Sequence, residues 1–363
     1  MVYFSILIFM AVVWLWKAQY ISEPYVRKNS GILYVIFMSI FLVLFSGLRG
    51  LTGTDTITYQ LFYETNFYPL SMEKLYIKMS QFFYQNGSSF TLFQIVTALL
   101  TILPIVIQYY KKSENIYFTL LLFYLFSFYL FSFNVSRQTL AAAILFFGYM
   151  NLKRQSLMSK IIFFLTILVS FEIHKSSLYM VFGLLGAYVI SKLILKKKSY
   201  LIFSGIVFIV LAVVFYKTNF VFNKLTSFSG SFSTYDGYLT AGTAGGVLTY
   251  KSLITFITAV LSSLLILMYS KFSSSYQNAK LFAPFLLYTL LEILQVNWIS
   301  DRLIIFMLPM IPLFFTHMVY SRDDKSITNN DRYMLSSIIF ILGIMSFGRI
   351  VIQNFGQILP YQG

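Results

Sequence analysis

The sequence predicts an all-α, polytopic integral membrane protein with about 12 transmembrane helices. Of its 363 residues, 58% are hydrophobic and only 11% are charged, which is more apolar than a soluble core of this size requires. The apolar residues are grouped in runs of about 20, the length that crosses roughly 30 Å of hydrocarbon. Because backbone groups in lipid must be hydrogen-bonded within their own segment, these runs are predicted to be helices.

The predicted spans follow one another along the whole chain. They are placed at 3–20, 31–48, 90–110, 116–133, 137–152, 160–173, 176–195, 200–216, 252–270, 281–300, 303–320 and 333–351. The first run has no basic residues before it and is followed by Lys17, Arg27 and Lys28, which indicates a retained anchor rather than a cleaved signal. We therefore expect residues 1–363 to form a single integral membrane domain.

The basic residues predict how the chain is oriented. Most of its 27 Lys and Arg residues fall in alternate loops between the spans, and loops rich in Lys and Arg face the cytoplasm. This assignment places both termini outside. The formal net charge of +15 is accounted for by this topology and by contact with anionic lipid headgroups, so no nucleic-acid partner is implied.

Several classes of chemistry lack their usual residues. The chain has no cysteine and two histidines, His174 and His317, which the predicted topology places at opposite membrane faces. This excludes thiolate chemistry and a histidine metal site within one chain. Walker, GxGxxG, GxSxG and HExxH motifs are absent, and we predict neither a metal nor another cofactor.

Two external segments, 49–89 and 217–251, interrupt the helical pattern, and we expect them to form a cap that faces the substrate. Residues 70–84 carry apolar side chains near helical spacing with acidic and basic residues between them, which predicts a helix in the membrane interface. The second segment is rich in Gly, Ser, Thr and Tyr. Either it is a flexible loop, or tyrosines such as Tyr235 stack on sugar rings.

Polar residues gather at the predicted outer ends of the spans. They are Arg49 after the second span, Arg137 and Gln138 at the start of the fifth, Glu172, His174 and Lys175 between the sixth and seventh, and Asp301 and Arg302 between the tenth and eleventh. Each could be an interfacial residue that reaches water or pairs locally. Several cations at headgroup depth on one face are instead typical of a phosphate or diphosphate site.

The tenth predicted span carries further polar residues on one helical face. Tyr288, Glu292, Gln295 and Arg302 are spaced by four, three and seven residues, which directs them to one side of a helix. Glu292 would lie about 15 Å deeper than Arg302 at 1.5 Å rise per residue. An acid at that depth is either functional or a hydrogen-bonded residue that holds helices together.

The short motifs resemble those of the EpsG-type exopolysaccharide polymerases, which are grouped with the Wzy O-antigen and capsule polymerases. They are Arg49, Gly53-Thr54-Asp55 and Tyr59, then Arg137-Gln138 with Ala141-Ala142, then His174-Lys175-Ser176-Ser177-Leu178. Their order and spacing cover roughly residues 30–190. The C-terminal half is similar mainly in hydropathy and in the Asp301-Arg302 pair.

The resemblance implies a GT-C-like membrane glycosyltransferase in the bacterial cytoplasmic membrane, acting on the outer face. Its substrates would be oligosaccharide repeat units on undecaprenyl diphosphate, and the growing glycan would be moved onto the acceptor unit. Membrane lipids, a chain-length regulator and a flippase of the same pathway are the other implied partners. A flippase for the lipid-linked unit and an O-antigen ligase stay open as alternatives.

Under this reading the arginines and Lys175 neutralise diphosphate, and an acid or histidine takes the proton of the acceptor hydroxyl. Asp55 is the first candidate because we expect it on a loop bent by Gly50 and Gly53, facing the acceptor. It could instead cap that loop or pair with Arg49. His174 is the second candidate, followed by Glu172 and Glu292.

Overall fold

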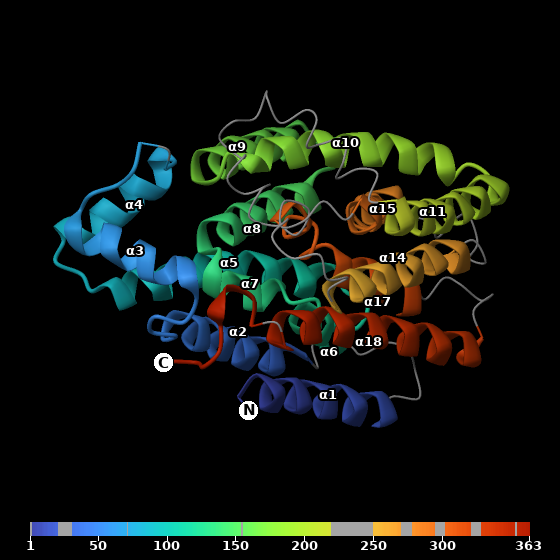
Figure 1. Cartoon of the computed structure of the whole chain (residues 1–363), viewed down its shortest axis with the longest axis horizontal. Coiled ribbons are helices and arrows are strands. Elements are labelled where there is room, and N and C mark those ends of the chain that lie inside the picture. Colours follow the sequence, from blue (N-terminus) through green and yellow to red (C-terminus); the bar gives the residue numbers. More distant parts are fainter. Residues whose placement is uncertain are drawn as a thin grey trace. The chain divides into compact units, whose positions relative to one another are not determined.

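The computed structural model describes residues 2–20, 31–70, 72–153, 155–218, 250–269, 278–294, 302–320, 328–352 and 354–363. All regular structure in these residues is helical, as predicted (Figure 1). Tyr235, Gln295 and Asp301 lie outside the described residues, as does most of the predicted external segment 217–251.

Every predicted span between residues 2 and 352 contains a helix. The helices are α1 Val2–Tyr20, α2 Ile32–Gly47, α3 Thr54–Thr65, α4 Lys74–Gln85, α5 Phe90–Lys112, α6 Ile116–Leu125, α7 Phe128–Asn134, α8 Ser136–Asn151, α9 Leu157–Ile173, α10 Ser176–Ile194, α11 Lys198–Thr218, α14 Tyr250–Tyr269, α15 Ala279–Leu294, α17 Ile311–Tyr320, α18 Asn329–Ile352, and the 3-10 helix η4 Phe355–Gln357. The helix predicted at 70–84 forms as α4, and its position in the membrane interface stays a prediction.

Two predicted spans differ from the helices that form, and a third is described only in part. The run 116–133 is two helices, α6 and α7, bent by 45° where Ser127 adopts φ 65°. In the run 303–320, residues 302–304 are helical, residues 305–310 form a turn that contains Pro309, and α17 begins at Ile311. A proline donates no backbone hydrogen bond and is favoured in the first helical turn, which Pro312 occupies. Of the run 281–300, residues 281–294 are described, and all of them are helical as part of α15.

The described helices are those of a membrane-embedded protein. Three of them are long and apolar enough to cross a bilayer, namely α5, α10 and residues 330–352 of α18, and the bent pair α6 and α7 is a fourth if it forms one span. Five shorter apolar helices accompany them. The count of 12 crossings and the GT-C-like architecture stay predictions.

The chain divides into two compact units. Unit 1 comprises Met1–Leu185 and Ile305–Gly363, and unit 2 comprises Gly186–Ile304. At the centre of unit 1, every residue of α6 and α7 is buried; α6 contacts α1, α5, α17 and α18, and α7 contacts α3, α5, α8 and η4. In unit 2, α11, α14 and α15 pack together around Ala212, Ala259 and Ile293. Nothing in this division tests the prediction of one membrane domain.

Unit 1 has two distinct ends. We call the first the motif end, which residues 48–55, 133–137 and 173–176 form together; α3 and α4 lie beside it, and both chain ends meet there, because Tyr3 donates to the Ile358 carbonyl at 2.8 Å (Figure 1). The second is the basic end, where α5 finishes with Lys111 and Lys112 and His317 pairs with Glu114 at 2.8 Å. Within this unit His174 and His317 therefore lie at opposite ends.

Candidate functional site

Arg49 lies in the bend between α2 and α3, and it holds that bend to neighbouring backbone. Its Nη1 donates to the Ser46 carbonyl at 2.6 Å and its Nε donates to the Phe133 carbonyl at 3.2 Å. The side chain is only 3% exposed, and this burial lowers the guanidinium pKa to about 10, although nearby tyrosine hydroxyls oppose the shift. Arg49 is therefore still charged at neutral pH, inside the protein.

The residues Gly53-Thr54-Asp55-Thr56 fasten the start of α3 to the turn between α7 and α8. The Asn134 Oδ1 accepts hydrogen bonds from the Thr54 hydroxyl at 3.0 Å and from the Asp55 backbone N–H at 2.8 Å. Thr56 donates to the Phe133 carbonyl at 2.8 Å. A side chain at position 53 would lie 2.5 Å from that carbonyl oxygen, and φ there is +98°, so only glycine fits.

The prediction that Asp55 lies on a loop is wrong. Asp55 is in the first turn of α3, where a carboxylate is favoured by the helix dipole. The loop was predicted because Gly50 and Gly53 dominate the local pattern and residues 54–65 have little apolar periodicity. The helix forms because Tyr59 and Tyr63 are buried against α4 and α5.

Arg137 stands in the first turn of α8, immediately after this turn. Its Nη1 pairs with the Glu73 Oε2 at 2.7 Å, and its Nε donates to the Tyr59 hydroxyl at 3.2 Å. The guanidinium also lies over the rings of Tyr59 and Tyr76, at 5.4 and 5.8 Å from their centroids. The Arg137 side chain keeps 21% of its surface exposed, so unlike Arg49 it reaches the surface.

Glu73 is a residue of the motif end that was not predicted from the sequence to be part of the site. It precedes α4 at the N-cap position, and its second carboxylate oxygen, Oε1, accepts the backbone N–H of Lys175 at 3.0 Å. It thereby connects the start of α8 with the turn between α9 and α10. The signal available in the sequence was an acid at the start of an amphipathic helix, predicted on the same outer face of the membrane as Arg49, Arg137 and Lys175.

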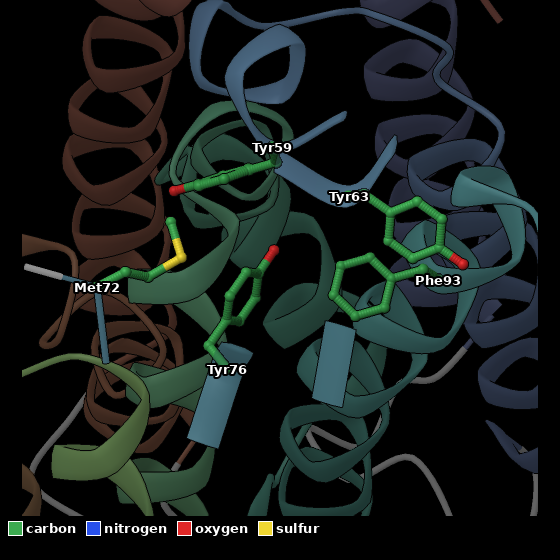
Figure 2. Close-up of a cluster of buried hydrophobic side chains, with 5 residues drawn as sticks. All are labelled: Tyr59, Tyr63, Met72, Tyr76 and Phe93. Carbon is green, nitrogen blue, oxygen red and sulfur yellow. The ribbon is translucent and has the colours of Figure 1, made fainter. Parts of the chain in front are cut away.

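An aromatic cluster fixes α3 and α4 against α5 beneath these polar contacts. It consists of Tyr59, Tyr63, Met72, Tyr76 and Phe93, all buried. Figure 2 shows Tyr59, Tyr76 and Met72 on one side of the cluster and the rings of Tyr63 and Phe93 on the other; those two rings stack at 5.6 Å. The Tyr76 hydroxyl is hydrogen-bonded by Ser136 and interacts with both Arg137 and Arg49, so the cluster borders both guanidinium groups.

The predicted residues around the turn between α9 and α10 also lie at the motif end, and their side chains differ in solvent exposure. His174 caps the end of α9, its Nδ1 is 2.8 Å from the Ser176 hydroxyl, and its ring meets Phe306 edge to face at 6.5 Å. The side chains of Glu172 and Lys175 are exposed. Gln138 is 1% exposed inside α8.

Comparison with known proteins identifies the family. A family model, described as the EpsG family, matches residues 32–363. The chain belongs to the EpsG family. The resemblance drawn from the short motifs is thus confirmed, and membership indicates a membrane protein of polysaccharide biosynthesis of the polymerase type, with glycosyltransferase-like activity. No curated protein and no solved structure matches the chain.

The EpsG-family motifs of the N-terminal half come together at the motif end of unit 1, where the structure places Arg49, Asp55, Tyr59, Arg137, His174 and Lys175. Gln138 and Glu172 also belong to unit 1, whereas Tyr288, Glu292 and Arg302 belong to unit 2. Tyr288 and Glu292 are buried in α15, with 2% and 5% exposure. Gln295 lies outside the described residues, so the predicted helical face that continues to Arg302 stays a prediction. The meeting of all four cations at one diphosphate stays a prediction.

Proposed function

We propose that this EpsG-family protein is a glycosyltransferase that polymerises repeat units carried on undecaprenyl diphosphate, on the outer face of the bacterial cytoplasmic membrane. The growing glycan on its lipid is the donor, and a single lipid-linked repeat unit is the acceptor. The C1–O bond to the donor diphosphate breaks, a glycosidic bond to the acceptor hydroxyl forms, the hydroxyl proton passes to a base, and undecaprenyl diphosphate leaves.

The position of Arg137 is the observation that carries this proposal. The guanidinium is held by Glu73 and Tyr59, is partly exposed, and stands at the N-terminus of a 16-residue helix. A helix N-terminus favours anions, and arginine binds phosphate oxygens through its planar fork of donors. Charge that develops on the leaving diphosphate would be stabilised here without rearrangement of the protein.

We assign other residues to the remaining tasks. Lys175 adds positive charge for the diphosphates, and the same role for Arg302 stays a prediction from the sequence. Arg49, whose donors already reach backbone carbonyls, holds the turn that precedes Arg137. The acceptor proton would pass to Asp55 or to His174. In His174 the Ser176 hydroxyl engages Nδ1, which would leave proton transfer to Nε2.

The chain length of lipid-linked glycan in a deletion strain tests the function. Mass spectrometry would find single lipid-linked units outside the membrane if a polymerase is lost. Single units trapped inside would indicate a flippase, and long chains that remain on lipid would indicate a ligase. Either of these two results would refute the proposal.

Arg137→Lys tests the site in the same strain. Lysine keeps the charge and loses the fork of donors, so we expect polymerisation to fall about 100-fold at normal protein level. Lys78→Arg, an exposed residue of α4, is the matched control and should polymerise normally. Normal chain length with Arg137→Lys would remove Arg137 from the diphosphate site.

A further inference from the structure

We propose that Glu73 is a positioning residue for the diphosphate site, and that it acts by holding the Arg137 guanidinium and the His174-Lys175 turn in one fixed arrangement. This inference rests on the proposed function, because the site it organises is the one assigned there. Nothing in the motif pattern pointed to Glu73, whose two carboxylate oxygens bind two different segments of the chain.

The two oxygens of Glu73 have separate partners. Oε2 accepts a short charge-assisted bond from Arg137 at 2.7 Å, and Oε1 accepts the backbone N–H of Lys175 at 3.0 Å. These partners are 64 and 102 residues away along the chain. One side chain thus connects α4, the first turn of α8 and the turn that leads into α10.

Glu73 is itself held in place by its surroundings. The carboxylate is 9% exposed, and the preceding residue, Met72, is buried in the aromatic cluster. The Glu73 carbonyl accepts the Ile77 N–H and begins α4, which packs on α9. A side chain with so little freedom loses little further entropy when it orients a partner.

The same contacts argue against Glu73 as the base for the acceptor hydroxyl. A base must offer an oxygen to the incoming proton, yet both oxygens already accept hydrogen bonds from the protein. Glu73 is suited to orienting Arg137 and unsuited to taking a proton.

Substitutions at position 73 have distinct expected effects. In Glu73→Gln the amide oxygen can still accept the hydrogen bond from the Lys175 backbone N–H. The amide NH₂ then faces the Nη1 of Arg137, and because both groups are donors, no hydrogen bond forms between them. In Glu73→Asp the charge is kept, and the side chain is one methylene too short to reach both partners. We expect Glu73→Gln to disorient Arg137 and Glu73→Asp to give an intermediate loss.

The test is a double-mutant cycle in the full-length protein reconstituted in lipid. Glu73→Gln, Arg137→Gln and the double variant are compared for polymerisation rate and for binding of inorganic pyrophosphate, with Glu64→Gln, an exposed acid of α3, as control. A misplacement of about 1 Å costs about 100-fold in rate, so we expect Glu73→Gln to lose about that factor and the double variant to be no worse than Arg137→Gln. Glu73→Asp should recover part of the loss, and Glu64→Gln should show none.

Several outcomes would overturn the inference. A wild-type rate in Glu73→Gln would show that the carboxylate is not needed, and losses that multiply in the double variant would show that Glu73 acts independently of Arg137. If the wild-type protein does not polymerise, the proposed function fails, and the inference is then decided by pyrophosphate: the cycle must still be non-additive in binding. Should Glu73→Gln not fold, the same cycle with Glu73→Asp must be non-additive.

Discussion

Replacing Arg49 by methionine and by lysine separates a buried structural arginine from a diphosphate ligand. Methionine matches the length of the arginine stem without its charge, whereas lysine keeps a charge without the fork. The structure predicts that methionine is tolerated at least as well as lysine at this position. A diphosphate ligand would give the opposite order, because lysine alone would retain the attraction for phosphate.

The magnitude follows from two opposing contributions. The two hydrogen bonds to the Ser46 and Phe133 carbonyls are each worth about 1.5–3 kcal/mol as bonds from a charged group. Against them stands the cost of burying the charge: the fall in guanidinium pKa from 12.5 to about 10 corresponds to about 3 kcal/mol at 1.36 kcal/mol per unit.

For Arg49→Met the two contributions nearly cancel, which leaves a net loss of roughly 0–3 kcal/mol. The Phe133 carbonyl also keeps its bond from Thr56. Arg49→Lys retains the burial cost, increased because an ammonium is more strongly hydrated, and loses at least one of the two bonds.

Thermal unfolding of purified variants in detergent with lipid measures the effect, at about 2–4 °C per kcal/mol for a unit of 150–250 residues. We expect Arg49→Met to lower Tm by no more than about 12 °C and to keep measurable polymerisation in the deletion strain. If Arg49→Lys has the Tm and chain length of the wild type while Arg49→Met is folded and inactive, Arg49 binds substrate and the argument from burial is wrong.

Three further predictions concern the surroundings of the site. Asn134→Ala leaves the Thr54 hydroxyl and the Asp55 N–H without their acceptor and should cost about 1–3 kcal/mol, read as a lower Tm; an unchanged Tm would mean that the turn is held without it. Tyr361→Phe should cost about 1 kcal/mol through its lost bond to the Phe45 carbonyl, and Tyr361→Ala clearly more, because its ring stacks on Phe45 at 4.2 Å; equal Tm values for the two variants would contradict the importance of stacking. Polymerisation in vitro should persist in EDTA, because basic groups are expected to neutralise the diphosphate; full loss that a divalent ion restores would disprove this.

The helical fold was largely predictable because each span carries a long apolar run, and lipid allows such a run little besides helix. Hydropathy could not locate the break between α6 and α7, since the residues on both sides are equally apolar and Ser127 reaches positive φ through its packing. It also missed α3. That helix depends on contacts of Tyr59 and Tyr63 with other segments, and such contacts leave no local periodicity.

The candidate site was predictable in part for a related reason. Arg137, His174 and Lys175 end apolar runs, where a charged residue is conspicuous. Glu73 lies at the N-cap of the amphipathic helix α4, where an acid is ordinary, and its importance comes from partners 64 and 102 residues away. Arg49 was as conspicuous as Arg137, but sequence does not distinguish a guanidinium directed at backbone carbonyls from one that reaches the surface.

The hydrogen bonds between residues 354–363 and the bend that contains Arg49 have a consequence for biogenesis. The Gln362 N–H donates to the Thr52 hydroxyl at 2.9 Å and the Gly53 N–H donates to the Gln357 carbonyl at 3.2 Å, so residues about 310 positions apart complete the same bend. During synthesis the early helices enter the membrane long before these partners exist. The bend that contains Arg49 is therefore completed only after residues 354–363 have been translated. A ribosome-bound chain that lacks these residues contains all the early motifs but not the hydrogen bonds that hold the bend in place.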